Sequence, residues 1–117
     1  MKIFKLSDCE IKDLPQGRIF LGPSSEEISF GYLELNPNQA LSKHNRPVDE
    51  ELIQINGESV ITLFPEEKKI TLNKGDYIKI PANKFHIHEN KSSEKCLTLW
   101  KFEGDITEII NSIKKLC

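Results

Sequence analysis

The sequence predicts an all-β fold, in which short antiparallel strands form a sandwich or barrel, followed by one carboxyl-terminal α-helix. Three observations support this prediction. Short apolar runs alternate with turn signals through the middle of the chain, as is typical of antiparallel β-structure. Helical periodicity is absent from the same region. An apolar stripe with helical spacing then appears at the carboxyl end.

Composition and charge restrict the domain organisation, the location and the partners. A chain of 117 residues with 38% hydrophobic residues can bury one core, so we expect residues 1–117 to form a single domain. The 16 basic and 18 acidic residues are interspersed, which argues against nucleic acid as a partner. No segment is apolar enough to be a signal peptide or a membrane span. Three widely spaced cysteines without a CxxC motif also fit a cytoplasmic protein.

Ile28–Leu35 is the first predicted strand, and it ends at Asn36-Pro37-Asn38 because proline cannot continue it. Residues 51–55 and 59–64 are the next two predicted strands, and they flank Asn56-Gly57. This dipeptide is a strong signal for a two-residue turn, since a type I′ turn needs positive φ at both central residues. We therefore predict a β-hairpin at Asn56-Gly57.

Four more strands are predicted in the second half of the chain. Residues 70–72 and Tyr77–Ile80 are separated by a turn that contains glycine, and Pro81 ends the second of them. Residues 85–88 and 94–102 follow, with a polar loop between them. The final strand carries apolar side chains in both alternating sets, so we expect both of its faces to be covered.

Helical spacing predicts an α-helix over about residues 105–116, because apolar residues recur at i, i+3, i+4, i+7 and i+10 from Ile106. Asp105 is a suitable N-cap residue, and Glu108 stands where a capping box needs it. We expect this helix to pack on the outer surface of the β-structure.

All three histidines fall in two short stretches. In the first stretch, His44-Asn45-Arg46 is followed after three residues by Glu50 and after six more by Gly57. In the second stretch, Gly75 is followed after five residues by Pro81-Ala82-Asn83, after two more by His86 and after three more by Asn90. Together they resemble the paired motifs of the cupin family, Gly-x5-His-x-His-x3/4-Glu-x6-Gly and Gly-x5-Pro-x-Gly-x2-His-x3-Asn. The spacing is kept throughout both stretches.

The first motif is degenerate. Asn38 in the first motif and Asn83 in the second replace glycines of the pattern, and these changes are mild because asparagine tolerates positive φ. Arg46 replaces the second histidine, which changes the chemistry. The resemblance implies a small cupin: a double-stranded β-helix (jelly-roll) barrel over about residues 28–102, with the helix outside it. It also implies a homodimer, a pairing that would cover open sheet edges.

Alternation along a strand places His44 with Arg46 on one face, and His86 with His88 on one face. Imidazole and carboxylate together suit first-row divalent metals. In cupins that bind metal, the positions matching His44, Arg46, Glu50 and His86 are the ligands. The resemblance therefore implies three of these ligands but not the fourth, because a guanidinium stays protonated and repels a dication.

Three hypotheses follow from the arginine. In the first, His44, Glu50, His86 and His88 bind Fe, Mn, Ni or Zn, and Arg46 holds an anionic substrate for a dioxygenase-like or isomerase-like reaction. In the second, the site binds no metal, and the protein is a small-molecule binding or sensing module whose Arg46 grips a carboxylate or phosphate. In the third, the pocket is vestigial, and the protein is a structural homodimer built through a sheet edge.

The choice of Glu50 as a ligand has an alternative of its own. Asp49 and Glu51 flank it, so the segment also reads as an acidic, solvated surface. If Glu51 faced inward instead, the alternation would be displaced and Glu50 would not be a ligand.

Overall fold

The computed structural model of the protein describes residues 5–115. It contains one 3-10 turn, ten strands and one helix in this order: η1 (Leu6–Asp8), β1 (Glu10–Leu14), β2 (Gly17–Ser24), β3 (Ile28–Leu35), β4 (Gln39–Ala40), β5 (Glu50–Asn56), β6 (Ser59–Leu63), β7 (Lys68–Leu72), β8 (Tyr77–Ile80), β9 (His86–Asn90), β10 (Cys96–Glu103) and α1 (Thr107–Lys114). No helix in this part of the chain has the length and apolar character needed to cross a membrane.

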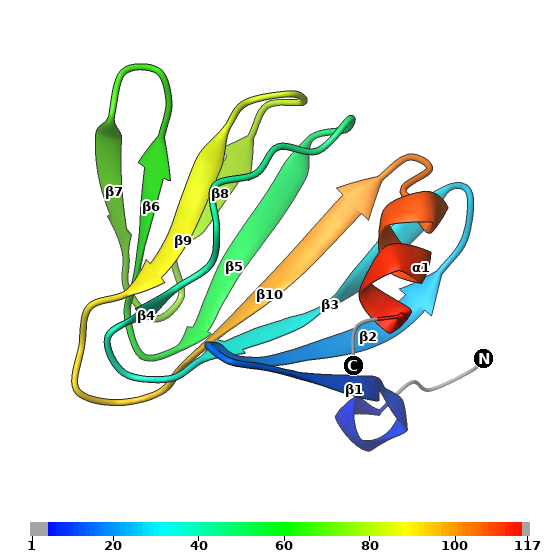
Figure 1. Cartoon of the computed structure of the whole chain (residues 1–117), viewed down its shortest axis with the longest axis horizontal. Helices are drawn as coiled ribbons and strands as arrows, with labels where there is room; N and C mark the ends of the chain where they lie inside the picture. Colours follow the sequence, from blue (N-terminus) through cyan, green and yellow to red (C-terminus); the bar gives the residue numbers. More distant parts are fainter. Residues whose placement is uncertain (1–4, 116–117) are drawn as a thin grey trace.

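The strands form two antiparallel sheets that face each other (Figure 1). The larger sheet has the strand order β1-β2-β3-β10-β5-β8, and the smaller one has the order β4-β9-β6-β7. The predicted all-β jelly-roll with a carboxyl-terminal helix is confirmed. The sheets form an open sandwich rather than a closed barrel, because the strands at the edges of the two sheets do not pair with each other in the described residues.

The predicted hairpin at Asn56-Gly57 is wrong. β5 pairs with β10 and β8, whereas β6 pairs with β7 and β9, so the chain passes from one sheet to the other here. Gly57 has φ of 71°, but Asn56 does not have positive φ. A Cβ on Gly57 would lie 3.0 Å from the Cα of Cys96. The glycine is therefore needed for a positive φ and for close approach between strands, not for a type I′ turn.

The strands β3 and β5 to β10 agree with the predicted ones to within a few residues, whereas the two-residue strand β4 was not predicted. β1 and β2, which form an antiparallel hairpin closed between Leu14 and Gly17, were not predicted. The available signal was the apolar run Ile19-Phe20-Leu21, one residue after the turn signal Pro15-Gln16-Gly17. Along β10 only one face is fully buried; Leu97 and Leu99 on the other face are half-buried, so the prediction that both faces are covered was wrong.

The helix α1 begins later than predicted and has no capping box. Asp105 Oδ1 accepts hydrogen bonds from the backbone nitrogen and the hydroxyl of Thr107, at 3.0 and 2.7 Å, and no side chain caps the helix from Ile106. The prediction that the helix lies outside is also wrong. Ile106 and Ile110 are buried in the same core as Trp100. The helix therefore covers the inner side of the large sheet, in front of β2, β3 and β10 (Figure 1).

A buried amide connects the two sheets below the site. Gln54 of β5 is 1% exposed, and its Oε1 accepts hydrogen bonds of 2.7 Å from Ser59 of β6 and from Thr98 of β10. A buried hydroxyl that loses its hydrogen-bond acceptor lowers the stability of the fold, because the group has been removed from water without a compensating hydrogen bond. The amide therefore supports the relative placement of three strands.

Replacing Gln54 with leucine should lower the free energy of unfolding by about 2 kcal/mol, because two buried hydroxyls lose their acceptor. The measurement is urea unfolding of the metal-free protein. A triple variant that also carries Ser59→Ala and Thr98→Val should recover part of the loss, since apolar partners remove the unpaired groups. An unchanged unfolding midpoint for the leucine variant would contradict the role assigned to the amide.

Candidate metal centre

The four side chains predicted as ligands meet between the two sheets. Glu50 begins β5, and His86 and His88 lie two residues apart on β9. His44 lies in the segment between β4 and β5, and it forms a bridge with His86 through backbone hydrogen bonds of 3.0 and 2.8 Å. Backbone pairing thus brings together histidines that are 42 positions apart in the sequence.

One nitrogen or oxygen from each of His44, Glu50, His86 and His88 lies within 4.8 Å of all the others. Ligand atoms bonded to one first-row ion at about 2.1 Å lie no more than about 4.2 Å apart. Small side-chain shifts would therefore be enough for one ion to contact all four. Three of the four side chains are buried, and His44 is half-buried at the cavity.

Hydrogen bonds fix the tautomers of two imidazoles. The Nδ1 of His44 lies 2.9 Å from the carbonyl oxygen of Ser42, and the Nδ1 of His86 lies 2.8 Å from that of Lys84. Because a carbonyl only accepts, each Nδ1 carries the hydrogen and each neutral ring presents a lone pair on Nε2. A backbone carbonyl behind the ring is a common support of metal-binding histidines.

The Nε2 of His86 and the Oε1 of Glu50 are the atoms that most directly suggest a cation. They lie 2.9 Å apart, yet both are buried and neither makes a hydrogen bond of acceptable geometry in the described structure. With the proton of His86 on Nδ1, two lone pairs face each other in a poorly solvated space. Such a pair is unfavourable unless a proton or a metal ion lies against both atoms. The residues therefore fit a divalent cation.

The protonation states also suit metal binding. Burial raises the pKa of Glu50, but in the metal-free protein a proton that the adjacent His86 and His88 present to the carboxylate outweighs burial and holds the pKa well below its usual range. Burial, followed by the neighbouring His88 and Arg46, lowers the pKa of His44 to about 4. At neutral pH the carboxylate is ionised and His44 is neutral, and these are the forms that ligate a metal.

The lowered pKa of His44 makes the stability of the metal-free protein depend on pH. The unfolded chain takes up a proton on His44 near pH 6.5, and the folded chain only near pH 4. Because the unfolded state then binds more protons, the free energy of unfolding should fall as the pH falls through this range. Urea unfolding in a chelator at several pH values measures the slope. His44→Gln should give a shallower slope, and an equal slope would contradict the assignment.

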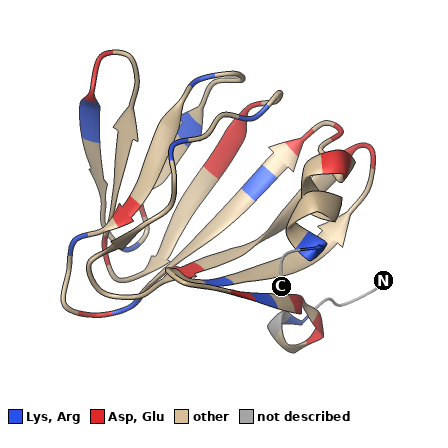
Figure 2. Ribbon diagram, in the orientation of Figure 1, with Lys and Arg blue, Asp and Glu red and all other residues tan. Residues whose placement is uncertain are grey.

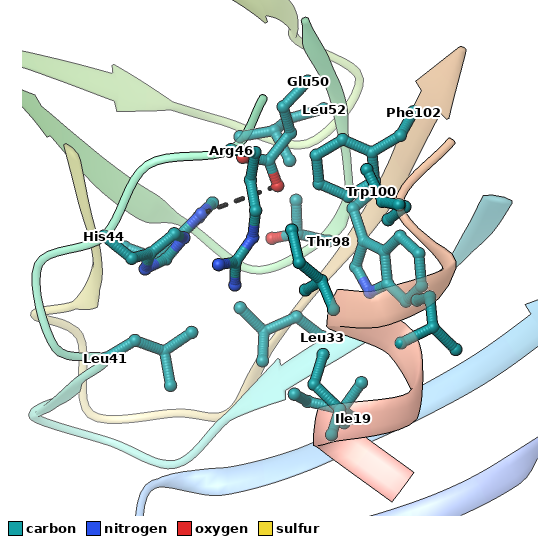
Figure 3. Close-up of a pocket in the computed structure, with 15 residues that line it drawn as sticks. Ile19, Leu33, Leu41, His44, Arg46, Glu50, Leu52, Thr98, Trp100 and Phe102 are labelled. Atoms are coloured by element: carbon teal, nitrogen blue, oxygen red, sulfur yellow. Dashed lines mark ion pairs between the residues drawn. The ribbon is translucent and has the colours of Figure 1, made fainter. Parts of the chain in front are cut away.

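Arg46 lies beside the candidate ligands, between His44 and Thr98 in the view of Figure 3. Its half-buried guanidinium donates one long hydrogen bond, 3.4 Å, to the carbonyl oxygen of Asn45, and it forms no ion pair within residues 5–115. Burial lowers its pKa, and Glu50 partly offsets this effect. Most of its five N–H donors are therefore unused by the protein.

A cavity of about 50 Å³ adjoins the cluster. His44, Arg46, Glu50 and His88 stand at its polar end, and Thr98 is its other polar lining residue. The rest of the wall is apolar and comes from the large sheet, from the segment after β4 and from α1: Ile19, Leu33, Leu41, Leu52, Trp100, Phe102, Ile106, Ile109, Ile110 and Ile113. A few convergent polar groups in an apolar wall are typical of small-molecule sites.

The structure brings all five predicted site residues together and selects between the two glutamates. Glu50 is 5% exposed and faces inward, whereas the carboxylate of Glu51 accepts a hydrogen bond of 2.6 Å from Tyr77 on the outer face. Asn38 and Asn83 have φ of 59° and 65°, as expected for residues at glycine positions of the motifs. The helix isoleucines were missed as cavity residues, because an apolar stripe does not specify the surface it covers.

The comparisons with known proteins agree with the fold. The family model described as "Cupin domain" matches residues 31–102. Structures of the oxalate decarboxylase of Bacillus subtilis, a protein with Mn(II) centres, superpose with a TM-score of 0.78 at 22% identity over 87% of this chain. The chain spans 29% of that protein's length.

Two solved structures match the chain over most of their own length. An RmlC-like cupin from Shewanella frigidimarina has a TM-score of 0.75 at 13% identity, over 88% of this chain and 90% of the other. A cupin superfamily protein from Desulfitobacterium hafniense has a TM-score of 0.67 at 22% identity, over 74% and 76%. No curated protein is a significant sequence match. At these identities the structural likeness establishes the fold.

Proposed function

Because this chain belongs to the cupin family, we propose that it binds one divalent cation through His44, Glu50, His86 and His88. The observation that carries the proposal is the contact of 2.9 Å between two buried lone-pair atoms, His86 Nε2 and Glu50 Oε1. Imidazole and carboxylate ligands suit Fe, Mn, Ni or Zn. Four ligands from the protein would leave two positions of an octahedral ion for a small molecule.

The test is metal content. Protein stripped with a chelator and dialysed against Fe, Mn, Ni or Zn should retain close to one equivalent of at least one of them by elemental analysis. A variant with His86→Ala should retain much less, because it loses a ligand whose tautomer is set by Lys84. Wild-type protein that retains no stoichiometric metal would refute the proposal.

Arg46 would hold an anionic small molecule beside the metal, because an unpaired guanidinium offers paired N–H donors that match a carboxylate or phosphate. A metal with open positions next to a held anion supports chemistry of the dioxygenase or isomerase type. The divalent metal would supply Lewis acidity or redox capacity when bound. The protein supplies the orientation of the anion and the exclusion of water by the apolar wall.

A metal-free binding or sensing module is the second candidate. The half-buried and unpaired Arg46 favours it, since this cation lies beside the ligands and weakens the attraction of the site for a dication. Chelators separate the two candidates: they should abolish ligand binding in a metal-dependent protein and leave it unchanged in a metal-free module. A vestigial pocket would bind neither metal nor anion.

The remaining features of the proposal concern organisation. We propose that residues 1–117 act as one domain, with a cytoplasmic location in keeping with reduced cysteines. We also propose a homodimer, as the family resemblance implies.

A further inference from the structure

We infer that the ligand of this cavity is a small monocarboxylate with an apolar tail. The inference rests on the proposed function and adds the chemical class of the ligand. Two features of the cavity carry it: one cationic group with unused donors at one end, and apolar side chains over nearly all of the rest.

The polar end accepts one anionic group. Arg46 can form a bidentate pair with a carboxylate, and the candidate metal ligands His44 and Glu50 line the same end. Within residues 5–115, no Lys and no second Arg lines the cavity. A second charged group on the ligand would therefore lack a matching partner and would be desolvated at a net cost.

Among the described residues, the indole N–H of Trp100 is the one free polar group in the remaining wall that could donate to a hydroxyl. Thr98 lines the cavity, but its hydroxyl already donates to Gln54 Oε1 at 2.7 Å. Trp100 and Phe102, whose rings lie 5.8 Å apart, and the isoleucines of α1 form the opposite side. An alkyl or similarly apolar tail is the complement of such a surface.

The size of the cavity limits the length of the tail. A volume of about 50 Å³ corresponds to about four water-sized groups. Acetate, with its carboxylate against Arg46, matches this volume, and tails of two or three carbons would reach the α1 isoleucines that line the cavity. A longer tail would have to extend between α1 and the large sheet, past the half-buried Ile109 and Ile113.

The test is calorimetry of the Mn(II)-loaded protein with acetate, propionate, butyrate and succinate. Each methylene from acetate to butyrate should strengthen binding about fourfold. Succinate carries a carboxylate where butyrate has its methyl group, and it should bind at least about tenfold more weakly. Equal affinity for succinate and butyrate, or no gain along the alkyl series, would overturn the inference.

Two variants test the two ends of the cavity separately. Arg46→Gln should weaken all three alkyl acids by a similar factor and keep the gain per methylene. Ile113→Ser should reduce that gain, whereas Asn111→Ser, on the exposed side of the same helix, should not. Circular dichroism and Mn(II) titration of each variant show whether it is folded and loaded.

The series also separates this inference from the metal proposal. Suppose that Mn(II) does not bind, but the metal-free protein binds butyrate more tightly than both acetate and succinate. The ligand class then stands and the metal proposal fails. If Mn(II) binds and the order is absent, the metal proposal stands and the ligand class fails.

A second inference rests on the outer face of the large sheet. The strand registers align one residue from each of its six strands into a single row, and every member is aliphatic or aromatic: Ile11, Phe20, Tyr32, Leu99, Ile53 and Tyr77. Ile11, Ile53 and Tyr77 are 45%, 38% and 54% exposed, Tyr32 and Leu99 are half-buried, and Phe20 is buried. We call this set the apolar row; its exposed members lie on β1, β5 and β8, and exposed apolar side chains that gather on one face mark interaction surfaces.

The charges beside the apolar row point to a second copy of this chain as the occupant. Next to the row, Lys101, Glu51 and Lys79 lie opposite one another on β10, β5 and β8, so the sign of the charge alternates. Figure 2 shows a basic segment of β10 beside an acidic segment of β5. Within one copy, Lys101 and Glu51 form an ion pair of 3.5 Å. A two-fold axis between β10 and β5 would set this pair against the same pair of a second copy in reverse order. Lys101 of each copy would then face Glu51 of the other, as a self-complementary interface requires.

We propose that the protein forms a homodimer through the apolar row. Analytical ultracentrifugation at micromolar concentration should show a dimer for the wild type and a monomer for Ile53→Glu, because the variant buries a charge without a partner. Phe85→Ser removes an equally exposed apolar side chain outside the row and should leave the dimer intact. A monomeric wild type would refute the proposal that this face forms the dimer. An Ile53→Glu variant that still dimerises would also refute it, and would be expected if the dimer formed through a sheet edge.

Discussion

Replacing Glu50 with glutamine is expected to weaken Mn(II) binding by at least about 100-fold. Glu50 is the only anion among the four candidate ligands, and its carboxylate is ionised at neutral pH because the two neighbouring histidines hold its pKa low. Glutamine keeps the shape of the side chain but removes the charge that offsets the dication. The measurement is calorimetric titration of chelator-treated protein with Mn(II).

Glu51→Gln is the matched control. It makes the same chemical change one position away, but on the opposite face of β5, where the carboxylate contacts Tyr77 and Lys101. Its affinity for Mn(II) should equal that of the wild type. Similar losses in both variants would indicate an effect of net charge alone, and no loss in Glu50→Gln would remove Glu50 from the site.

Glu50→Gln weakens metal binding, but it should not weaken the folding of the metal-free protein. The amide of glutamine can donate a hydrogen bond to His86 Nε2, which in the wild type faces a carboxylate oxygen without one. The metal-free variant should therefore unfold at the same or a higher urea concentration than the wild type. Greater stability combined with lost metal affinity is typical of a functional site rather than a structural contact.

Local pattern and motif spacing were enough to predict which polar side chains meet at the candidate site. Alternation on β9 puts His86 and His88 on one face, and motif spacing selects Glu50 as the inward residue of β5. The positive φ of Asn38 and Asn83 follows from their positions in the motifs. These predictions hold because each depends on neighbours within a few residues, or on a family spacing that already encodes the fold.

Features that depend on long-range pairing could not be read in the same way. Asn56-Gly57 has the composition of a hairpin turn, but β5 finds its partners in β10 and β8, which lie far along the chain. The stripe of isoleucines predicts a helix without saying which surface it covers, and the structure places that stripe on the cavity. Competition between distant partners decides such features, and short patterns do not record it.

Arg46→His completes the four positions of the family pattern, and we expect it to raise affinity for Mn(II) by at least about tenfold. Two effects act in the same direction. The change removes a half-buried cation beside the site, and it adds an imidazole that can ligate. The measurement is competition for Mn(II) against a chelator of known affinity.

Arg46→Gln separates the two effects, because it removes the charge without adding a ligand. If repulsion by the guanidinium dominates, the glutamine variant should show most of the gain; if ligation dominates, only the histidine variant should. Both variants should lose affinity for butyrate, since neither offers paired cationic donors. A histidine variant that binds Mn(II) no better than the wild type would mean that position 46 does not face the ion. Arg46 would then be ruled out as a group that lies between metal and ligand.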